Sequence, residues 1–219
     1  MSAIVTFIGW HDSGKTALVS EVVKELKKLG YRVAVIKSSN VCGIEFDKPG
    51  SDTFMHKKAG ADSVMLVAPD RMVLQTENRR LSLRTLAHRY FADADIVIGE
   101  GFKAARKVAK VEVISNPEQR IREKVHGVIA VATDLEGIAG DYVFRLDEAE
   151  EIALFLQKRF LVGMAKRERT ALLVDGNKIP IKSYIQEALA GTVEGFVKTL
   201  KIDRDMGEIE LRIKLGQDQ

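Results

Sequence analysis

The stretch "GWHDSGKT", from Gly9 to Thr16, decides the fold of this chain. It matches the phosphate-binding pattern G-x-x-x-x-G-K-[ST] at every fixed position. Glycines let such a loop turn tightly and point its N–H groups at phosphate oxygens, while Lys15 offsets charge on the β and γ phosphates and Thr16 places its hydroxyl on Mg²⁺. We therefore expect a nucleotide to bind through Gly9, Asp12, Ser13, Gly14, Lys15 and Thr16.

The residues on either side of this loop predict a strand, a turn and a helix. Residues 3–9 form a short apolar run rich in β-branched side chains, which is typical of a buried strand. The segment 15–30 has apolar residues at helical spacing and ends at Gly30. The loop thus leads into a helix N-terminus, where unpaired N–H groups and the helix dipole favour an anion. This context favours a nucleotide site over a purely structural turn.

The composition is that of an ordinary globular protein. Among the 219 residues, 46% are hydrophobic and 30% are charged, with a net charge of +3. Lys and Arg are interleaved with Asp and Glu, so a nucleic-acid partner is not expected. The single cysteine, Cys42, excludes an internal disulfide, and no apolar run approaches the roughly 20 residues of a membrane span. No signal peptide precedes the first strand, and we expect a cytoplasmic protein that does not enter a membrane.

Strands and helices alternate beyond the first helix. We predict strands at 31–37, 62–68, 71–77, 94–101, 110–115 and 127–134, and helices at 52–58, 81–91 and 147–160. This alternation favours a mostly parallel sheet covered on both faces, with ligands at the carboxyl ends of the strands. The expected fold class is α/β, with a P-loop NTPase fold that binds GTP in a first domain over residues 1–160.

The pattern changes after residue 160. Two apolar runs flank Asp175-Gly176-Asn177, which is a hairpin signal. A helix is predicted over 183–200, and an alternating strand over 207–215. Residues 161–219 therefore form a small β-β-α-β C-terminal domain, too short to bury much surface alone, which we expect to pack on the first domain or on a second subunit.

Carboxylates near the phosphate loop are candidates for Mg²⁺. Glu100 ends an apolar strand, where it can hold Mg²⁺ through a water or position an attacking water; the alternative is a solvated strand end. Asp47 and Asp52 bracket part of the long loop 38–52; Asp47 is slightly favoured as a metal ligand, and Asp52 equally fits a helix cap.

Three further features bear on the ligand. Lys37 and Lys103 each follow a strand, where a lysine faces either an anionic ligand or solvent. Asp134 follows the strand 127–134, where its carboxylate can accept hydrogen bonds from guanine, although the lysine that many GTPases carry two residues earlier is absent. The alternative for Asp134 is a plain turn. The histidines are scattered and Cys42 has no neighbour at ligand spacing, so a zinc site is not expected.

Six stretches together carry a family resemblance: "GWHDSGKT", "VAVIKSSN", "FDKPGSDTFMHKKAGA", "VIGEGFK", "KVEVI" and "VIAVATD". The chain resembles the molybdopterin-guanine dinucleotide biosynthesis protein B family over residues 3–160, and its tail resembles an extra domain of some members. The resemblance implies a homodimer that binds GTP with Mg²⁺, hydrolyses it slowly, and assists the guanylyltransferase partner that attaches GMP to molybdopterin. It implies phosphate and Mg²⁺ positions for Gly14, Lys15 and Thr16, the acidic strand end for Glu100 and the base side for Asp134.

One departure from the family stands after the second strand. Ser38, Ser39 and Asn40 replace a histidine-rich stretch of many members, so a metal, molybdate or pterin role of those histidines does not carry over. Among functions, a GTP-binding adaptor with weak hydrolysis is favoured. The alternatives are a small-molecule kinase, disfavoured because the loop 38–52 contains no arginine to stabilise a transferred phosphoryl group, and a scaffold whose nucleotide is only structural.

Overall fold

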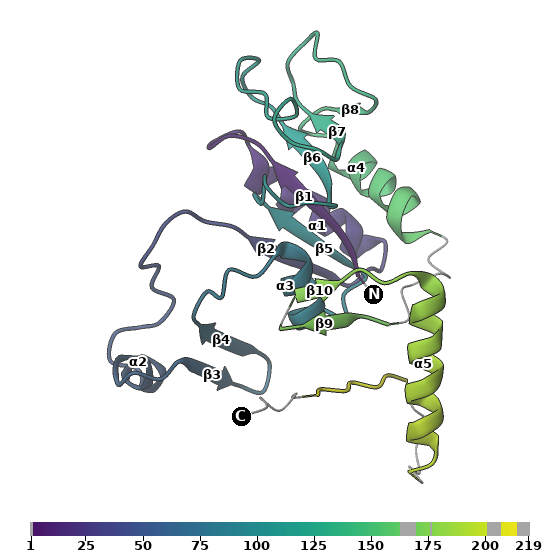
Figure 1. The fold of residues 1–219 in the computed structure, drawn as a ribbon. Coiled ribbons are helices and arrows are strands. Elements are labelled where there is room, and N and C mark those ends of the chain that lie inside the picture. The colour runs from purple at the N-terminus through teal and green to yellow at the C-terminus, as the bar shows by residue number, and fades with distance from the viewer. Residues whose placement is uncertain (1, 163–169, 176, 201–206, 214–219) are drawn as a thin grey trace. The chain divides into compact units, whose positions relative to one another are not determined.

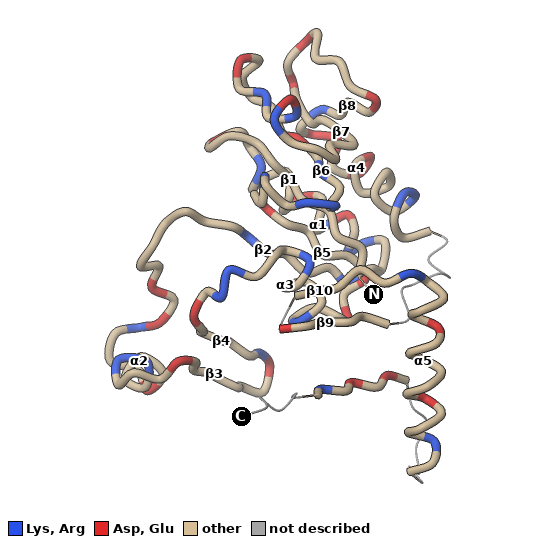
Figure 2. Tube along the Cα trace, in the orientation of Figure 1, with Lys and Arg blue, Asp and Glu red and all other residues tan. Residues whose placement is uncertain are grey.

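The structure is a computed structural model that describes residues 2–162, 170–175, 177–200 and 207–213. The chain divides into two compact units, residues 1–164 and 165–219. Acidic and basic residues are interspersed along the chain in both units (Figure 2). No helix among the described residues is long and apolar enough to cross a membrane.

A six-stranded parallel sheet forms the centre of the first unit (Figure 1). Its order is β2-β5-β1-β6-β7-β8. The strands are β1 (Ala3–Ile8), β2 (Val33–Lys37), β5 (Ile96–Glu100), β6 (Ala109–Val113), β7 (Val128–Ala132) and β8 (Val143–Phe144). β5, buried along its whole length, lies between β2 and β1. The sheet confirms the predicted α/β class, and β8, only two residues long, is an addition to it.

Helices cover both faces of this sheet. On one face lie α1 (Lys15–Lys28) and α4 (Ala149–Leu156), which continues as a π-helical turn η1 (Gln157–Leu161). Leu18, Val22, Leu26, Ile152 and Leu156 pack there on side chains of β1, β5 and β6. On the other face, α3 (Leu83–Tyr90) approaches β5 at Gly99, where an added Cβ would lie 2.8 Å from Leu83 Cδ2. The predicted helices 81–91 and 147–160 are thus confirmed.

Two buried charges on β6 fasten loops to the sheet. Lys110 donates to the carbonyl oxygens of Ala105 (2.6 Å), His126 (2.8 Å) and Val108 (3.2 Å). Glu112 accepts hydrogen bonds from the backbone N–H groups of residues 121 and 122. Both residues are at most 2% exposed, so these hydrogen bonds replace those that water would make to Lys110 Nζ and Glu112 Oε1, whereas Glu112 Oε2 has no hydrogen-bond partner among the described residues.

The segment between β2 and α3 forms a separate sheet. β3 (Ser63–Val67) pairs with β4 (Met72–Thr76) in an antiparallel hairpin, preceded by α2 (Asp52–Lys58). The sequence predicts both strands but places them in the mostly parallel sheet; the structure pairs them with each other, because their four-residue connection permits only antiparallel neighbours. The hairpin leaves many apolar side chains exposed, namely Met65, Leu66, Val67, Met72, Val73 and Leu74.

The second unit contains a hairpin and a helix. β9 (Leu172–Val174) pairs with β10 (Asn177–Ile179), and α5 (Ser183–Lys198) follows. Gln186 joins them, since its side chain donates to Ile181 and its carbonyl accepts from Thr170. The predicted strand 207–215 is wrong over its described part, because residues 207–213 pair with no strand that the structure describes. Their alternating apolar side chains are exposed, so no buried face stabilises a strand there. Residues 214–215 lie outside the described residues.

Candidate functional site

The loop after β1 has the geometry of an anion cradle. A side chain on Gly9 would begin 2.5 Å from the carbonyl oxygen of Val113, so only glycine fits. Asp12 (φ 57°) and Gly14 (φ 84°) adopt the left-handed conformation, which turns the loop into the start of α1. No side chain caps α1 and its first turn carries no acidic residue. Its first N–H groups are therefore available to an anion, and no carboxylate in the first turn competes for them.

Lys15 bends back over this loop. Its Nζ donates to the carbonyl oxygen of Trp10 and to Ser13 Oγ at 3.1 Å. Burial lowers the pKa of the Lys15 ammonium, and the nearby charge of Lys103 lowers it further. Lys103 itself lies over the ring of Trp10, with Nζ 4.8 Å from the ring centroid. Positive charge is therefore concentrated around the loop, as binding of a phosphate chain requires.

Thr16, Glu100 and Lys37 form a hydrogen-bonded cluster beside the loop. The Thr16 hydroxyl donates to Glu100 Oε1 at 2.6 Å, and Lys37 Nζ lies 2.9 Å from the same oxygen. Lys37 also donates to Thr16 Oγ1 at 3.3 Å. The register explains the meeting, because Lys37 of β2 is paired with Glu100 of the neighbouring β5. Gly101 (φ 95°) follows β5 and allows the chain to lie close to Ser38, since an added Cβ would be 3.2 Å from the Ser38 Cβ.

Glu100 is ionised in this setting. Burial acts to raise its pKa, but the hydrogen bonds from Thr16 and Lys37 and the charges of Lys37 and Lys15 outweigh it, so the pKa of Glu100 lies below its usual value. The charged carboxylate accepts the one hydrogen bond that the Thr16 hydroxyl can donate. The lone pairs of Thr16 Oγ1 are therefore available to a cation. This donor set fits Mg²⁺, which binds one or two protein oxygens together with phosphates and water.

The Asp47 carboxylate accepts hydrogen bonds from Ser51, in the same loop, and from Gln75. Its Oδ1 accepts from Ser51 Oγ at 3.1 Å and its Oδ2 from Gln75 Nε2 at 3.2 Å. The hydrogen bond from Thr53 is the first cause that lowers the pKa of Asp47, ahead of those from Ser51 and Gln75. Within the described residues, no hydrogen bond or ion pair joins Asp47 to the Thr16 cluster. The structure therefore does not bring Asp47 and Glu100 together as a ligand pair.

The cap of α2 is Ser51, whose Oγ accepts from the Phe54 N–H at 3.3 Å. Asp52 does not make the cap hydrogen bond that the sequence suggested for it. It occupies the first helical position instead, where its charge is favourable to the helix dipole.

Asp134 is connected to the phosphate loop indirectly, through Leu146. Its Oδ1 accepts from the Leu146 N–H at 3.0 Å. The Leu146 side chain in turn lies near Gly14, since an added Cβ on that glycine would be 3.8 Å from Leu146 Cδ1. Asp134 Oδ2 makes no hydrogen bond to the residues that the structure describes and is open to a ligand. Sequence reasoning missed Leu146 and Trp10, and nothing in their residue types signals a site.

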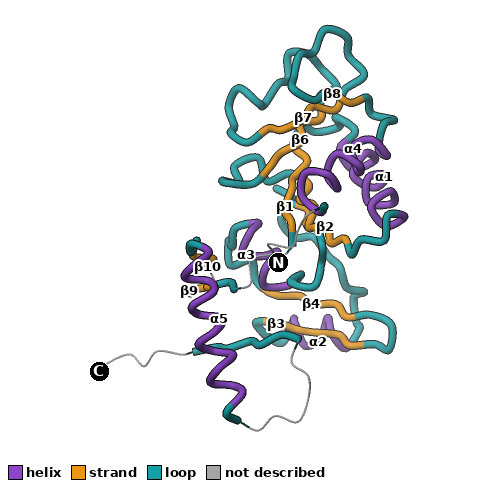
Figure 3. The backbone as a smooth tube through the Cα atoms, turned by 90° about the vertical axis from the view of Figure 1, so that its right-hand side faces the viewer, coloured by secondary structure: helices purple, strands orange, loops and turns teal. Residues whose placement is uncertain are grey.

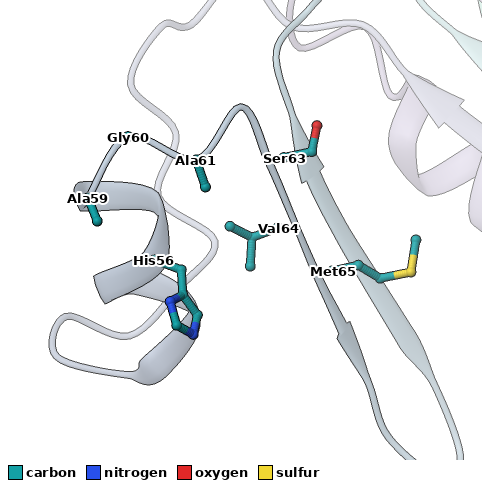
Figure 4. Close-up of a pocket in the computed structure, with 7 residues that line it drawn as sticks. All are labelled: His56, Ala59, Gly60, Ala61, Ser63, Val64 and Met65. Atoms are coloured by element: carbon teal, nitrogen blue, oxygen red, sulfur yellow. The ribbon is translucent and has the colours of Figure 1, made fainter.

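A shallow hollow of about 610 Å³ lies elsewhere, between α2 and β3 (Figure 4). It is lined by His56, Ala59, Gly60, Ala61, Ser63, Val64 and Met65. The only ionisable side chain in that lining is His56, and no residue of the phosphate loop takes part. Across the described residues, no three His, Cys, Asp or Glu side chains form a metal-binding group. The charged cluster at the phosphate loop is the better candidate site.

Comparison with known proteins points to one family. Residues 4–134 match the family model "Molybdopterin guanine dinucleotide synthesis protein B". The chain is 31% identical over 155 residues to the molybdopterin-guanine dinucleotide biosynthesis adapter protein of Haemophilus influenzae, covering 68% of this chain and 84% of that protein. It is 25% identical over 225 residues to the putative adapter protein of Methanocaldococcus jannaschii, covering 90% of this chain and 92% of the relative. A crystal structure of molybdopterin-guanine biosynthesis protein B superposes with a TM-score of 0.58 at 30% identity, covering 71% of this chain and 98% of the other.

Proposed function

The chain belongs to the molybdopterin guanine dinucleotide synthesis protein B family, and from this premise we propose that it is an adapter in molybdopterin guanine dinucleotide biosynthesis that binds Mg²⁺ and GTP. One observation carries the proposal: the hydroxyl of Thr16, in the first turn of α1, donates a hydrogen bond to Glu100 at the end of β5. This places a metal-ready oxygen next to the N–H groups and the Lys15 ammonium that a phosphate chain needs.

The base end of the nucleotide supports GTP. The open Oδ2 of Asp134 is a carboxylate acceptor, and guanine presents two adjacent donors that adenine does not. Leu146 links this carboxylate to the start of α1, which supports the proposal that one nucleotide uses both loops. We assign Asp134 to the base and residues 9–16 to the phosphates.

Hydrolysis is proposed to be slow. The side-chain cations that contact the Thr16 cluster and the loop carbonyls are lysines, and loop 38–52 has no arginine. A supplied arginine accelerates phosphoryl transfer by about 10³ to 10⁵ in nucleotide hydrolases. Slow turnover suits an adapter that assists a guanylyltransferase partner. Rapid phosphoryl transfer to a small molecule by the isolated protein would instead indicate a kinase.

A homodimer is part of the same proposal. The hairpin β3–β4 exposes the Val67 side chain by 66% and that of Met72 by 68%, and these two residues are cross-strand neighbours. Contiguous apolar surface of this kind is typical of an interaction site. We further propose a cytoplasmic location, which rests on the sequence expectation and on the exposed, unpaired Cys42.

The central test is calorimetric titration with GTP, GDP and ATP in Mg²⁺, for the wild type and Lys15→Ala. We expect the variant to lose about 2 to 4 kcal/mol of GTP binding free energy, because a charge-assisted phosphate contact is removed from a partly desolvated loop. Native circular dichroism serves as the control for folding. An unchanged dissociation constant in a folded variant would refute the nucleotide site.

A further inference from the structure

Lys37 stands at the position that a cation on Thr16 would take. The Thr16 hydroxyl donates its only hydrogen bond to Glu100 Oε1, at 2.6 Å. Its Oγ1 can therefore only accept, and the group it accepts from is the Lys37 ammonium at 3.3 Å. The same ammonium lies 2.9 Å from Glu100 Oε1. One Nζ thus bridges both oxygens of the metal-ready pair.

A divalent metal cannot join this arrangement without a change. Mg²⁺ holds its oxygen ligands at about 2.1 Å and demands near-octahedral geometry. A metal at that distance from Thr16 Oγ1 would compete for the oxygen that Lys37 now contacts, with strong repulsion between the cations. The Lys37 side chain is 59% exposed, so it is free to swing into solvent, whereas the Glu100 side chain, 9% exposed, is held in place.

We propose that Lys37 is a built-in cation that occupies the metal position on the Thr16–Glu100 pair and must leave it before a divalent metal enters. The inference rests on the proposed nucleotide site and adds a residue that opposes metal binding in the empty protein. Phosphate oxygens of an arriving nucleotide offer the displaced ammonium a new partner. Metal and nucleotide binding are thereby coupled through one side chain.

The test measures Mn²⁺ binding by electron paramagnetic resonance, first with Mn²⁺ alone and then with GDP present. Lys37→Met should tighten the binding of Mn²⁺ alone by about tenfold, because it removes the competing charge. The gain should be smaller with GDP present, because the phosphates then draw the wild-type ammonium away from the metal position. Lys37→Arg, which keeps the charge, should stay close to the wild type. Lys27→Met is the matched control: it removes an exposed lysine charge from the last turn of α1, away from Thr16 and Glu100, and should change the affinity by less than about threefold.

A second substitution locates the effect. Adding Glu100→Gln to Lys37→Met should abolish the gain, since the metal then loses its carboxylate. Equal or weaker binding of Mn²⁺ alone by Lys37→Met than by the wild type, no Mn²⁺ binding by this variant in either titration, or an equal gain with Lys27→Met would each overturn the proposal. If GDP fails to bind at all, the nucleotide site is refuted, and the titration with Mn²⁺ alone still decides the role of Lys37.

Discussion

Single atoms determine what the phosphate loop can bind. Asp134 Oδ1 accepts from the Leu146 N–H, whereas Oδ2 accepts no hydrogen bond from the described residues and is the atom that we assign to the guanine base. Glu100 likewise fixes the direction of the Thr16 hydroxyl. At both positions a neutral amide of the same shape keeps the packing and changes only the hydrogen-bonding character, which makes the amide substitutions informative.

Asp134→Asn should lower the preference for GTP over ATP by about tenfold. The amide oxygen is expected to keep the Leu146 hydrogen bond, which turns the amide NH₂ group toward the guanine donors. Competition binding of the two nucleotides measures the ratio. Asp141→Asn, an exposed carboxylate on the neighbouring loop, is the control, and an unchanged ratio in Asp134→Asn would show that Asp134 is only a turn residue.

Glu100→Gln should leave GTP bound while slowing its hydrolysis by about tenfold or more, because the site loses the charge that holds Mg²⁺ or orients water. Single-turnover hydrolysis at saturating Mg²⁺ measures the effect. Glu151→Gln on the exposed side of α4 controls for the loss of a charge elsewhere. Hydrolysis at the wild-type rate would require Glu100 to be given up as the catalytic carboxylate.

Among the elements, β6 combines a central place in the sheet with two buried charges. Lys110 holds residues on either side of the strand, since Ala105 and Val108 precede it and His126 follows it. The loop that carries Lys103 is thus fastened to the sheet at its far end. Three carbonyl acceptors depend on one ammonium, so the loss of that group removes the donor from three carbonyl oxygens, of which that of Val108 is in a buried hydrogen bond.

Lys110→Met should lower the free energy of unfolding by about 2 to 4 kcal/mol, because the methionine fills similar space but donates no hydrogen bond. Urea denaturation followed by circular dichroism measures the change. Lys107→Met, an exposed lysine nearby, provides the comparison. Equal stability of Lys110→Met and the wild type would mean that water satisfies these carbonyls as well as the ammonium does.

The elements also show where sequence reasoning succeeds. The apolar run before Gly9 and the helical spacing after Thr16 predict β1 and α1, because burial on the sheet dictates the residue types. The pairing of β3 with β4 and the lack of a strand at 207–213 depend on which partners are available in space, and periodicity does not report that. At the site, Glu100 and Thr16 follow from a motif and a strand end. Leu146 does not, because its role comes from a contact across the fold.

On the scale of the molecule, the chain has one unit with a large buried core and a second whose hairpin and helix leave much apolar surface exposed. In the first unit, Figure 3 shows the hairpin β3–β4 and α2 on the side of the unit away from β7 and β8. The hairpin lies outside the six-stranded sheet, so the proposed dimer contact is separate from the strands that carry the proposed nucleotide site.

Replacing Met72 by Lys together with Val67 by Glu should convert a homodimer into a monomer, because charges would replace the most exposed apolar pair of the hairpin. Sedimentation velocity over a range of concentrations reads the mass. Arg79→Glu, a charge change in the exposed segment that follows β4, should leave the association unchanged. A dimer that survives the double substitution would place the interface elsewhere.

Trp10 gives the phosphate loop an optical property. It is the only tryptophan in the chain, so all of the indole fluorescence of this protein originates within the loop. The Lys103 ammonium lies over its ring, and the Lys15 ammonium is bound to its carbonyl oxygen. A phosphate chain that draws either lysine away changes the electric field at the indole and shifts its emission. Occupancy of the loop can thus be followed in real time on the unlabelled protein, by the colour and intensity of light from one residue.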